Sequence, residues 1–189
     1  LFLGAVFTIS FRFINEIVQY TIRSEKFEQS DFELNEKGLF IEIFDKIKKP
    51  SSSLSNLSLG SEIYWNIARN HLRNSAADQL LLVNTEGHII EALEANIYII
   101  NGNRIRGANC EHGAYLDISK TLLHEIFSKL NLRYSENEEI TIHDIRSAEE
   151  IMTVNAIEGI RWIVGFEGKR FFNHTIRKIS EIFGRSLLS

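Results

Sequence analysis

The sequence predicts a mixed α/β fold of the α+β type. Two observations lead to this prediction: strand-like runs follow one another through hairpin turns, and amphipathic helices separate groups of these runs. Strand and helix do not alternate regularly, which argues against a doubly wound parallel sheet. We expect a small antiparallel piece at the N-terminus, followed by a larger domain of mixed strands with flanking helices.

Three strands are predicted in the N-terminal part, over residues 5–13, 16–25 and 38–47. In the first, Phe7 and Phe11 belong to an apolar series that alternates with polar residues, the period of a half-buried strand. The chain begins within this pattern and without a methionine, so we expect a segment to precede it.

A domain boundary is predicted in the polar, turn-rich stretch "KFEQSDFELNEKG" between the second and third strands. On this reading residues 1–30 are the C-terminal remnant of a small domain and residues 31–36 a linker. Residues 37–189 then form a larger domain of the cofactor-binding type.

Helices and strands alternate in groups through the larger domain. Ser61 is a suitable N-cap for a helix over 61–74, with Glu62 in its first turn. The remaining predictions are a β-meander over 79–105, a helix over 114–132, a strand over 139–145, two or three strands within 147–172 and a closing helix over 173–188.

Composition excludes several classes of protein. The 189 residues are 44% hydrophobic and 24% charged, as in an ordinary globular protein. A formal charge of -4 gives no support to a nucleic-acid binder, which would usually carry a basic face. The single Cys110 rules out an internal disulfide and fits a reducing compartment. No apolar run approaches the roughly 18 residues of a membrane span.

Common site motifs are missing from the sequence. The six histidines show no H-x-x-x-H spacing and there is no C-x-x-C pair, so the sequence predicts no metal site. Neither a G-x-G-x-x-G nor a G-K-[ST] motif is found, which removes the usual nucleotide fingerprints. Three basic residues, Lys46, Lys48 and Lys49, are interpreted as a solvated strand end.

One set of motifs does fit together. The stretches "LLLVNTEGHIIEALEANIYIINGNRI", "GAYLDISKTLL" and "AEEIMTVNAIEGIRWI" occur in this order and spacing. Together they resemble the pyridoxal-phosphate enzymes of fold type IV, also called class IV aminotransferases. This family includes branched-chain and D-amino-acid aminotransferases and aminodeoxychorismate lyase. The resemblance runs from about Ala5 to the end of the chain, and it implies the two-domain architecture of fold type IV.

The resemblance implies a cofactor site. In the family a strand glutamate pairs with the pyridine nitrogen and an asparagine follows five residues later, which here are Glu91 and Asn96. A carboxylate beside the ring nitrogen keeps it protonated, which makes the ring a better electron sink. Taken alone, Glu91 would be an edge-strand surface carboxylate.

Two phosphate-binding loops are also implied. The first is Gly113, Ala114 and Tyr115 at the expected start of a helix, where free amides and the helix dipole favour an anion. The second is Asn155 and Ala156, which could equally be an ordinary strand-to-turn segment. The pairs Ala95-Asn96 and Asn155-Ala156 are more similar to the lyase than to the branched-chain enzymes.

The family's Schiff-base lysine is replaced. Counting along both flanks places that position at Ser58, and a hydroxyl forms no stable imine and is a poor base near neutral pH. Loss of acid–base catalysis alone typically costs roughly 10²–10⁴-fold. Lys48 and Lys49 are not expected to substitute, because they end a preceding strand and loop. The family's N-terminal segment, with a phosphate-binding arginine, is not in this chain.

The function implied is therefore that of an aminotransferase or lyase homologue with weak or no activity. The resemblance also implies pyridoxal 5'-phosphate as cofactor, a small amino acid or an aminodeoxychorismate-like substrate, a homodimer and a cytoplasmic location. Two alternatives stay open: a non-catalytic binding or interaction protein on the same scaffold, and a fragment or altered form of an active aminotransferase.

Overall fold

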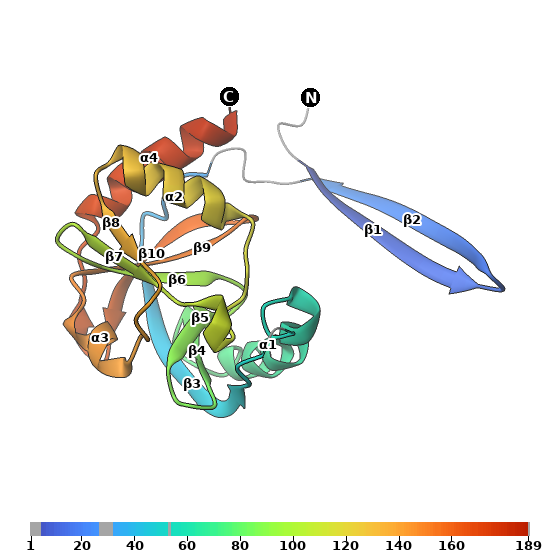
Figure 1. Ribbon diagram of the computed structural model, residues 1–189, viewed down its shortest axis with the longest axis horizontal. Helices are drawn as coiled ribbons and strands as arrows, with labels where there is room; N and C mark the ends of the chain where they lie inside the picture. The colour runs from blue at the N-terminus through green and yellow to red at the C-terminus, as the bar shows by residue number, and fades with distance from the viewer. Residues whose placement is uncertain (1–4, 27–31, 53, 189) are drawn as a thin grey trace. The chain divides into compact units, whose positions relative to one another are not determined.

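The computed structural model of the chain describes residues 5–26, 32–52 and 54–188, without the side chains of residues 58–59 and 187–188. The chain divides into two compact units, Leu1–Phe32 and Glu33–Ser189. The larger unit contains mixed strands with flanking helices, as the sequence predicts, and the smaller one is an antiparallel pair (Figure 1). The roles predicted for the two units remain predictions.

The smaller unit is a β-hairpin. Strands β1 (Ala5–Ile14) and β2 (Ile17–Lys26) pair antiparallel along their full length. Asn15 and Glu16 form the two-residue turn with positive φ values of 48° and 64°, as a type I′ turn requires. Every residue of both strands is exposed in this unit.

The larger unit contains one mixed sheet, which in the described residues has nine strands. Their order is β5-β4-β3-β10-β9-β6-β7-β8, and β11 pairs with β10. The pairs β3–β4, β3–β10 and β7–β8 are parallel, and the others are antiparallel. The bounds are β3 (Leu39–Lys49), β4 (Gln79–Asn84), β5 (Ile89–Ala92), β6 (Asn96–Asn101), β7 (Arg104–Gly107), β8 (Arg133–Ser135), β9 (Glu150–Asn155), β10 (Gly159–Phe166) and β11 (Lys169–Arg170).

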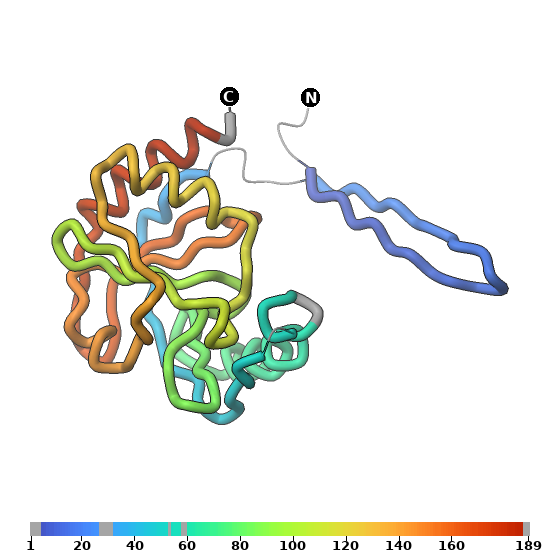
Figure 2. The backbone as a smooth tube through the Cα atoms, viewed as in Figure 1, coloured from blue at the N-terminus to red at the C-terminus, as the bar shows by residue number. Residues whose placement is uncertain are grey.

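The helices of this unit lie between the strands along the chain and at its end. Figure 2 traces the backbone from β3 in blue to α4 in red. They are α1 (Ser58–Leu72), the short 3-10 helix η1 (Cys110–His112), α2 (Ser119–Lys129), α3 (Ile142–Ser147) and α4 (His174–Leu188). None of the helices in the described residues is long and apolar enough to cross a membrane.

Two cores lie on opposite faces of β3 and β4. Phe44 and Leu82 pack with Trp65 and Ala68 of α1, so α1 covers one face. On the other face, Ile41 of β3 and the side chains of β4 that point away from α1 belong to a second core with β6, β9 and β10. Because β4 is buried on both sides, its central residues 80–83 are all hydrophobic rather than alternating.

Helix α4 begins at the carboxylate of Glu150. Both oxygens of the buried Glu150 accept from the amide of Thr175, and Oε2 also accepts from Ile176. A carboxylate at this position satisfies free amides and complements the helix dipole.

Three predicted elements differ from the structure. Helix α1 begins at Ser58, because the Ser61 amide already bonds to the Leu57 carbonyl. Ser61 is therefore not an N-cap: it is buried inside the helix, and its hydroxyl donates to the carbonyls of Ser55 and Leu57.

The strand predicted over 139–145 is wrong beyond a single bridge at Ile140. Helix α3 forms there because Thr141 and Asp144 make a capping box, in which each side chain accepts from the other residue's amide. The helix predicted over 114–132 begins later, at Ser119, whose amide donates to Asp117. Ala114 and Tyr115 therefore precede the helix and do not form its first turn.

Candidate functional site

The candidate site lies where the C-terminal end of β3 meets β4, β5 and α1. Leu82 of β4 pairs with Phe44 of β3 and with Glu91 of β5, so all three lie on the face that α1 covers. Trp65 reaches this face from α1. Glu91 is consequently fully buried, and it does not form an exposed edge of the sheet.

Lys49 reaches the same face through an irregularity in β3. Phe44 pairs with Leu82 and Lys49 pairs with Asn84, so five steps along β3 accompany two steps along β4. Simple alternation would place Lys49 on the face opposite Phe44, and the register shift reverses this. The interpretation of Lys49 as part of a solvated strand end is therefore wrong, because only 1% of its side chain is exposed.

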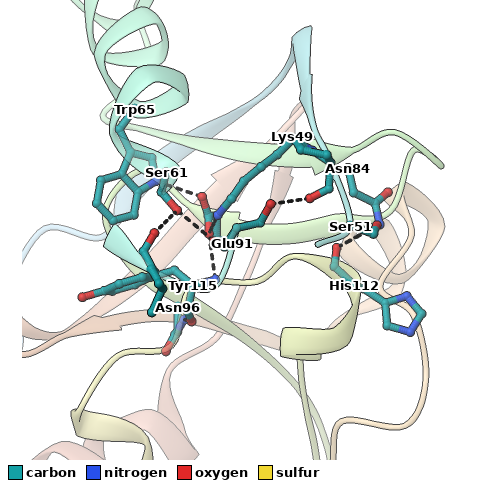
Figure 3. A network of polar contacts seen from close by, with 12 residues as sticks. Lys49, Ser51, Ser61, Trp65, Asn84, Glu91, Asn96, His112 and Tyr115 are labelled. Carbon is teal, nitrogen blue, oxygen red and sulfur yellow. Dashed lines mark hydrogen bonds and ion pairs between the residues drawn. The ribbon is translucent and has the colours of Figure 1, made fainter. Parts of the chain in front are cut away.

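Glu91 accepts hydrogen bonds from three donors (Figure 3). Oε2 lies 2.7 Å from the Lys49 Nζ atom and 2.9 Å from the Tyr115 amide nitrogen. Oε1 accepts from the Trp65 Nε1 atom at 2.8 Å. A buried carboxylate requires such partners, because in a low dielectric an unpaired charge is strongly destabilising.

The buried pair is electrostatically coupled. Burial lowers the pKa of Lys49, while the charge and hydrogen bond of Glu91 act in the opposite direction. Burial likewise raises the pKa of Glu91, against the effects of Lys49, Trp65 and the Tyr115 amide. Each group thus depends on the other to remain charged, and removal of either would leave an uncompensated charge.

The first predicted phosphate loop is adjacent to this pair, but its amides have partners within the chain. Asn96 donates through Nδ2 to the Tyr115 carbonyl at 2.5 Å, and its Oδ1 is buried without a partner. Gly113 follows η1 with a φ of 94° and bonds to the Cys110 carbonyl. The Ala114 amide bonds to the Asn109 carbonyl, and the Tyr115 amide is taken by Glu91.

The second predicted loop is a closed turn. Asn155 Oδ1 accepts from the amides of Ile157 and Glu158 at 3.0 and 2.6 Å. The Ala156 amide donates to Asp117 Oδ2 at 3.3 Å. The loop is thus connected, through Asp117, to the segment that follows Tyr115.

Ser58 is the first residue of α1, whereas the position of the family lysine implies a loop leading into the helix. The resemblance also implies that the Ser58 side chain points into the same cavity as Glu91; this side chain lies outside the described part of the structure, so its direction stays a prediction. Lys49 is the residue that sequence reasoning missed. Its place at the end of a preceding strand predicts that it is distant from the site, whereas its Nζ atom contacts the carboxylate that the resemblance assigns to the pyridine nitrogen.

The residues present do not fit pyridoxal 5'-phosphate in this arrangement. The lysine ammonium stands against Glu91 where a protonated ring nitrogen would have to lie. The amides of Tyr115 and Ala156, one from each expected phosphate loop, donate to the carboxylates of Glu91 and Asp117. A phosphate there would meet like charge in place of free donors.

Known proteins share this fold. The family profile of amino-transferase class IV matches residues 39–165. No curated protein matches the chain.

Among solved structures, a branched-chain aminotransferase from Thermoproteus uzoniensis with norvaline is similar at a TM-score of 0.79 and 20% identity, over 90% of this chain and 57% of that one. A putative 4-amino-4-deoxychorismate lyase from Legionella pneumophila is similar at a TM-score of 0.73 and 18% identity, over 90% of this chain and 62% of that one. For the 4-amino-4-deoxychorismate lyase from Pseudomonas aeruginosa the TM-score is 0.77 and the identity 10%, over 90% of this chain and 63% of that one.

The chain thus spans less than two thirds of the length of these structures. Their low identity supports the fold alone, whereas the family profile covers more than half of the 189 residues. The fold predicted from the sequence is confirmed, and the chain belongs to the class IV aminotransferase family.

Proposed function

We propose that this chain is a weakly active or inactive homologue of class IV aminotransferases and aminodeoxychorismate lyases. The observation that carries the proposal is the buried ion pair between Lys49 and Glu91, 2.7 Å apart. This pair uses the carboxylate that the family's cofactor chemistry needs. Serine at position 58, where the resemblance places the catalytic lysine, supports the same conclusion.

The occupied amides give independent support. Binding of a phosphate at Tyr115 and Ala156 would require both amides to leave Glu91 and Asp117. The displaced carboxylates would then lose donors while facing a new negative charge. Each such loss typically costs about 1–3 kcal/mol for a buried group, so the arrangement disfavours an anionic cofactor.

The finer properties are proposals that rest on the family. We propose a homodimer in the cytoplasm and, if any substrate is turned over, a small amino acid or an aminodeoxychorismate-like compound. Light scattering of the purified chain measures the oligomeric state directly.

The test of the proposal is titration of the purified chain with pyridoxal phosphate, followed by absorbance, and then borohydride reduction and peptide mass mapping. We expect no saturable absorbance change and no adduct at one defined residue. Scattered labelling of exposed lysines, equal in the wild type and Lys49→Met, is also compatible with the proposal.

A stoichiometric adduct at Lys49 together with amino-donor turnover would overturn the proposal. It would show that Lys49 has taken over the role of the missing lysine, as in an altered but active aminotransferase. Lys48→Met is the matched control, because Lys48 is the exposed neighbour of Lys49.

A further inference from the structure

Three metal-ligating side chains from separate segments converge outside the candidate site. They are His88 before β5, His112 at the end of η1 and Glu139 after β8. One ligand atom of each lies within 4.8 Å of the others. His88 Nε2 is 3.6 Å from Glu139 Oε2, and His112 Nδ1 is 3.8 Å from Glu139 Oε1.

These separations are unsuited to hydrogen bonding but suited to shared coordination. A nitrogen and an oxygen 3.6–3.8 Å apart are beyond the usual hydrogen-bond range. Ligands about 2.0–2.2 Å from a tetrahedral Zn²⁺ lie about 3.3–3.6 Å from one another. Small side-chain rotations would bring the three groups to that spacing.

The backbone that carries the two histidines is held together without any metal. Asn84 is fully buried; its Oδ1 accepts from the His88 amide at 2.8 Å, and its Nδ2 donates to the His112 carbonyl at 3.2 Å. Ser51 donates to the same carbonyl (Figure 3). One asparagine therefore fixes both histidine backbones relative to each other.

Glu139 is positioned by the neighbouring bridge. Ile89 and Ile140 pair antiparallel, and the Ile89 amide donates to the Ile140 carbonyl at 2.7 Å. His88 and Glu139 immediately precede these two residues. In an antiparallel bridge these two residues are diagonal neighbours on the same face, within reach of long side chains. The bridge limits their relative movement, which reduces the ordering cost of binding an ion.

The surroundings suit a small cation. The three side chains line a small cavity of about 10 Å³, with room for little more than one water-sized group. Their side chains are 23%, 36% and 49% exposed, so ions can reach them from solvent. His88 Nδ1 is buried without a hydrogen-bond partner, so no hydrogen bond from this nitrogen fixes the orientation of the imidazole.

We propose that His88, His112 and Glu139 form a site for one divalent transition-metal ion, with Zn²⁺ as the representative. Two imidazoles and a carboxylate are a ligand set that Zn²⁺ accepts, with water in the fourth position. This site is separate from the Lys49–Glu91 pair, and it does not depend on the function proposed for that pair.

The experiment uses the full chain without a histidine tag, freed of metal with a chelator that is then removed. Calorimetric titration with ZnCl₂ is expected to give one site per chain, and CoCl₂ is expected to give the visible spectrum of a low-coordinate ion. His88→Ala, His112→Ala and Glu139→Gln should each weaken Zn²⁺ binding by about tenfold or more, since loss of even an outer partner costs 10–100-fold.

Two matched variants separate this site from unspecific surface binding. Glu138→Gln alters the neighbouring carboxylate of the same cavity, which is paired with Arg106, and His143→Ala removes an exposed histidine of α3. Both should bind Zn²⁺ as the wild type does. Failure of the wild type to bind one equivalent, or equal binding by the three ligand variants, would overturn the proposal. Because Glu139 is half exposed, Glu139→Gln keeps the test valid if a histidine variant misfolds.

Discussion

The Nζ atom of Lys49 lies 2.7 Å from the carboxylate of Glu91, and both side chains are almost completely buried. The two residues are 42 positions apart in the chain. In the family that this chain belongs to, the resemblance assigns that carboxylate to a cofactor. Here it is satisfied from within the protein, by Lys49, Trp65 and the Tyr115 amide.

Lys49→Met and Glu91→Gln should each destabilise the protein by about 3–5 kcal/mol, because each leaves one partner of a buried pair uncompensated. The double variant should be at least about 1 kcal/mol more stable than the sum of the single effects, since it contains no unpaired buried charge, and the oxygen of the glutamine at position 91 can still accept from Trp65 or from Tyr115. Urea unfolding of the four proteins measures this. Lys48→Met should be close to neutral, and strictly additive effects would argue against a coupled pair.

Ser58→Lys tests the position that the resemblance assigns to the catalytic lysine. In the double variant Ser58→Lys/Lys49→Met, the competing ammonium is gone and a new amine stands at residue 58. We expect borohydride reduction with pyridoxal phosphate to give an adduct at residue 58 in this variant and none there in the wild type. Peptide mass mapping reads the result. Labelling confined to exposed lysines in both proteins would contradict this prediction.

Trp65→Phe should destabilise the protein by about 1.5–3 kcal/mol, because a bond from Nε1 to a charged acceptor is lost while the ring remains. The matched control is Trp162→Phe. Its Nε1 donates to the neutral carbonyl of Asn35, so a loss of about 0.5–1.5 kcal/mol is expected. Denaturant unfolding followed by circular dichroism compares the two, and an equal or reversed order would contradict a charged Glu91.

The capping box of α3 should make stability depend on pH. Burial opposes ionisation of Asp144, but the hydrogen bonds from Thr141 and Arg106 outweigh it, and the pKa of this carboxyl is lowered. A lowered pKa stabilises the folded state above the unfolded pKa of about 3.9, and this contribution is lost as the pH falls through the folded value.

Asp144→Asn should therefore be less stable than the wild type near neutral pH, and the difference should shrink as the pH falls below about 4. Thr141→Ala should cost about 0.5–2 kcal/mol through loss of the cap. Thermal unfolding at several pH values checks both. A difference that stays constant down to about pH 2, below the unfolded pKa, would show that Asp144 ionisation does not contribute.

Local patterns in the sequence were sufficient to predict the family and most of the helices and strands. The spacing between Glu91 and Asn96 is local to one strand, turn and strand, and the alternation of residues 5–13 is local to one hairpin, so neither needs knowledge of distant contacts. The capping box at Thr141 and Asp144 was also readable, but the apolar alternation around it suggested a strand. The start of α1 was misplaced because Ser58 carries no cap signal, and the true N-cap, Leu57, makes no side-chain bond.

The contacts between distant groups depend on the tertiary structure. Lys49 faces Glu91 because an irregular register between β3 and β4 reverses its side, and this reversal depends on how the two strands pair. His88, His112 and Glu139 likewise come together through a bridge and a buried asparagine that connect segments with no common spacing. Periodicity reports which face of one element is apolar. The partner of a buried charge is set by contacts between elements, and these depend on the folded chain as a whole.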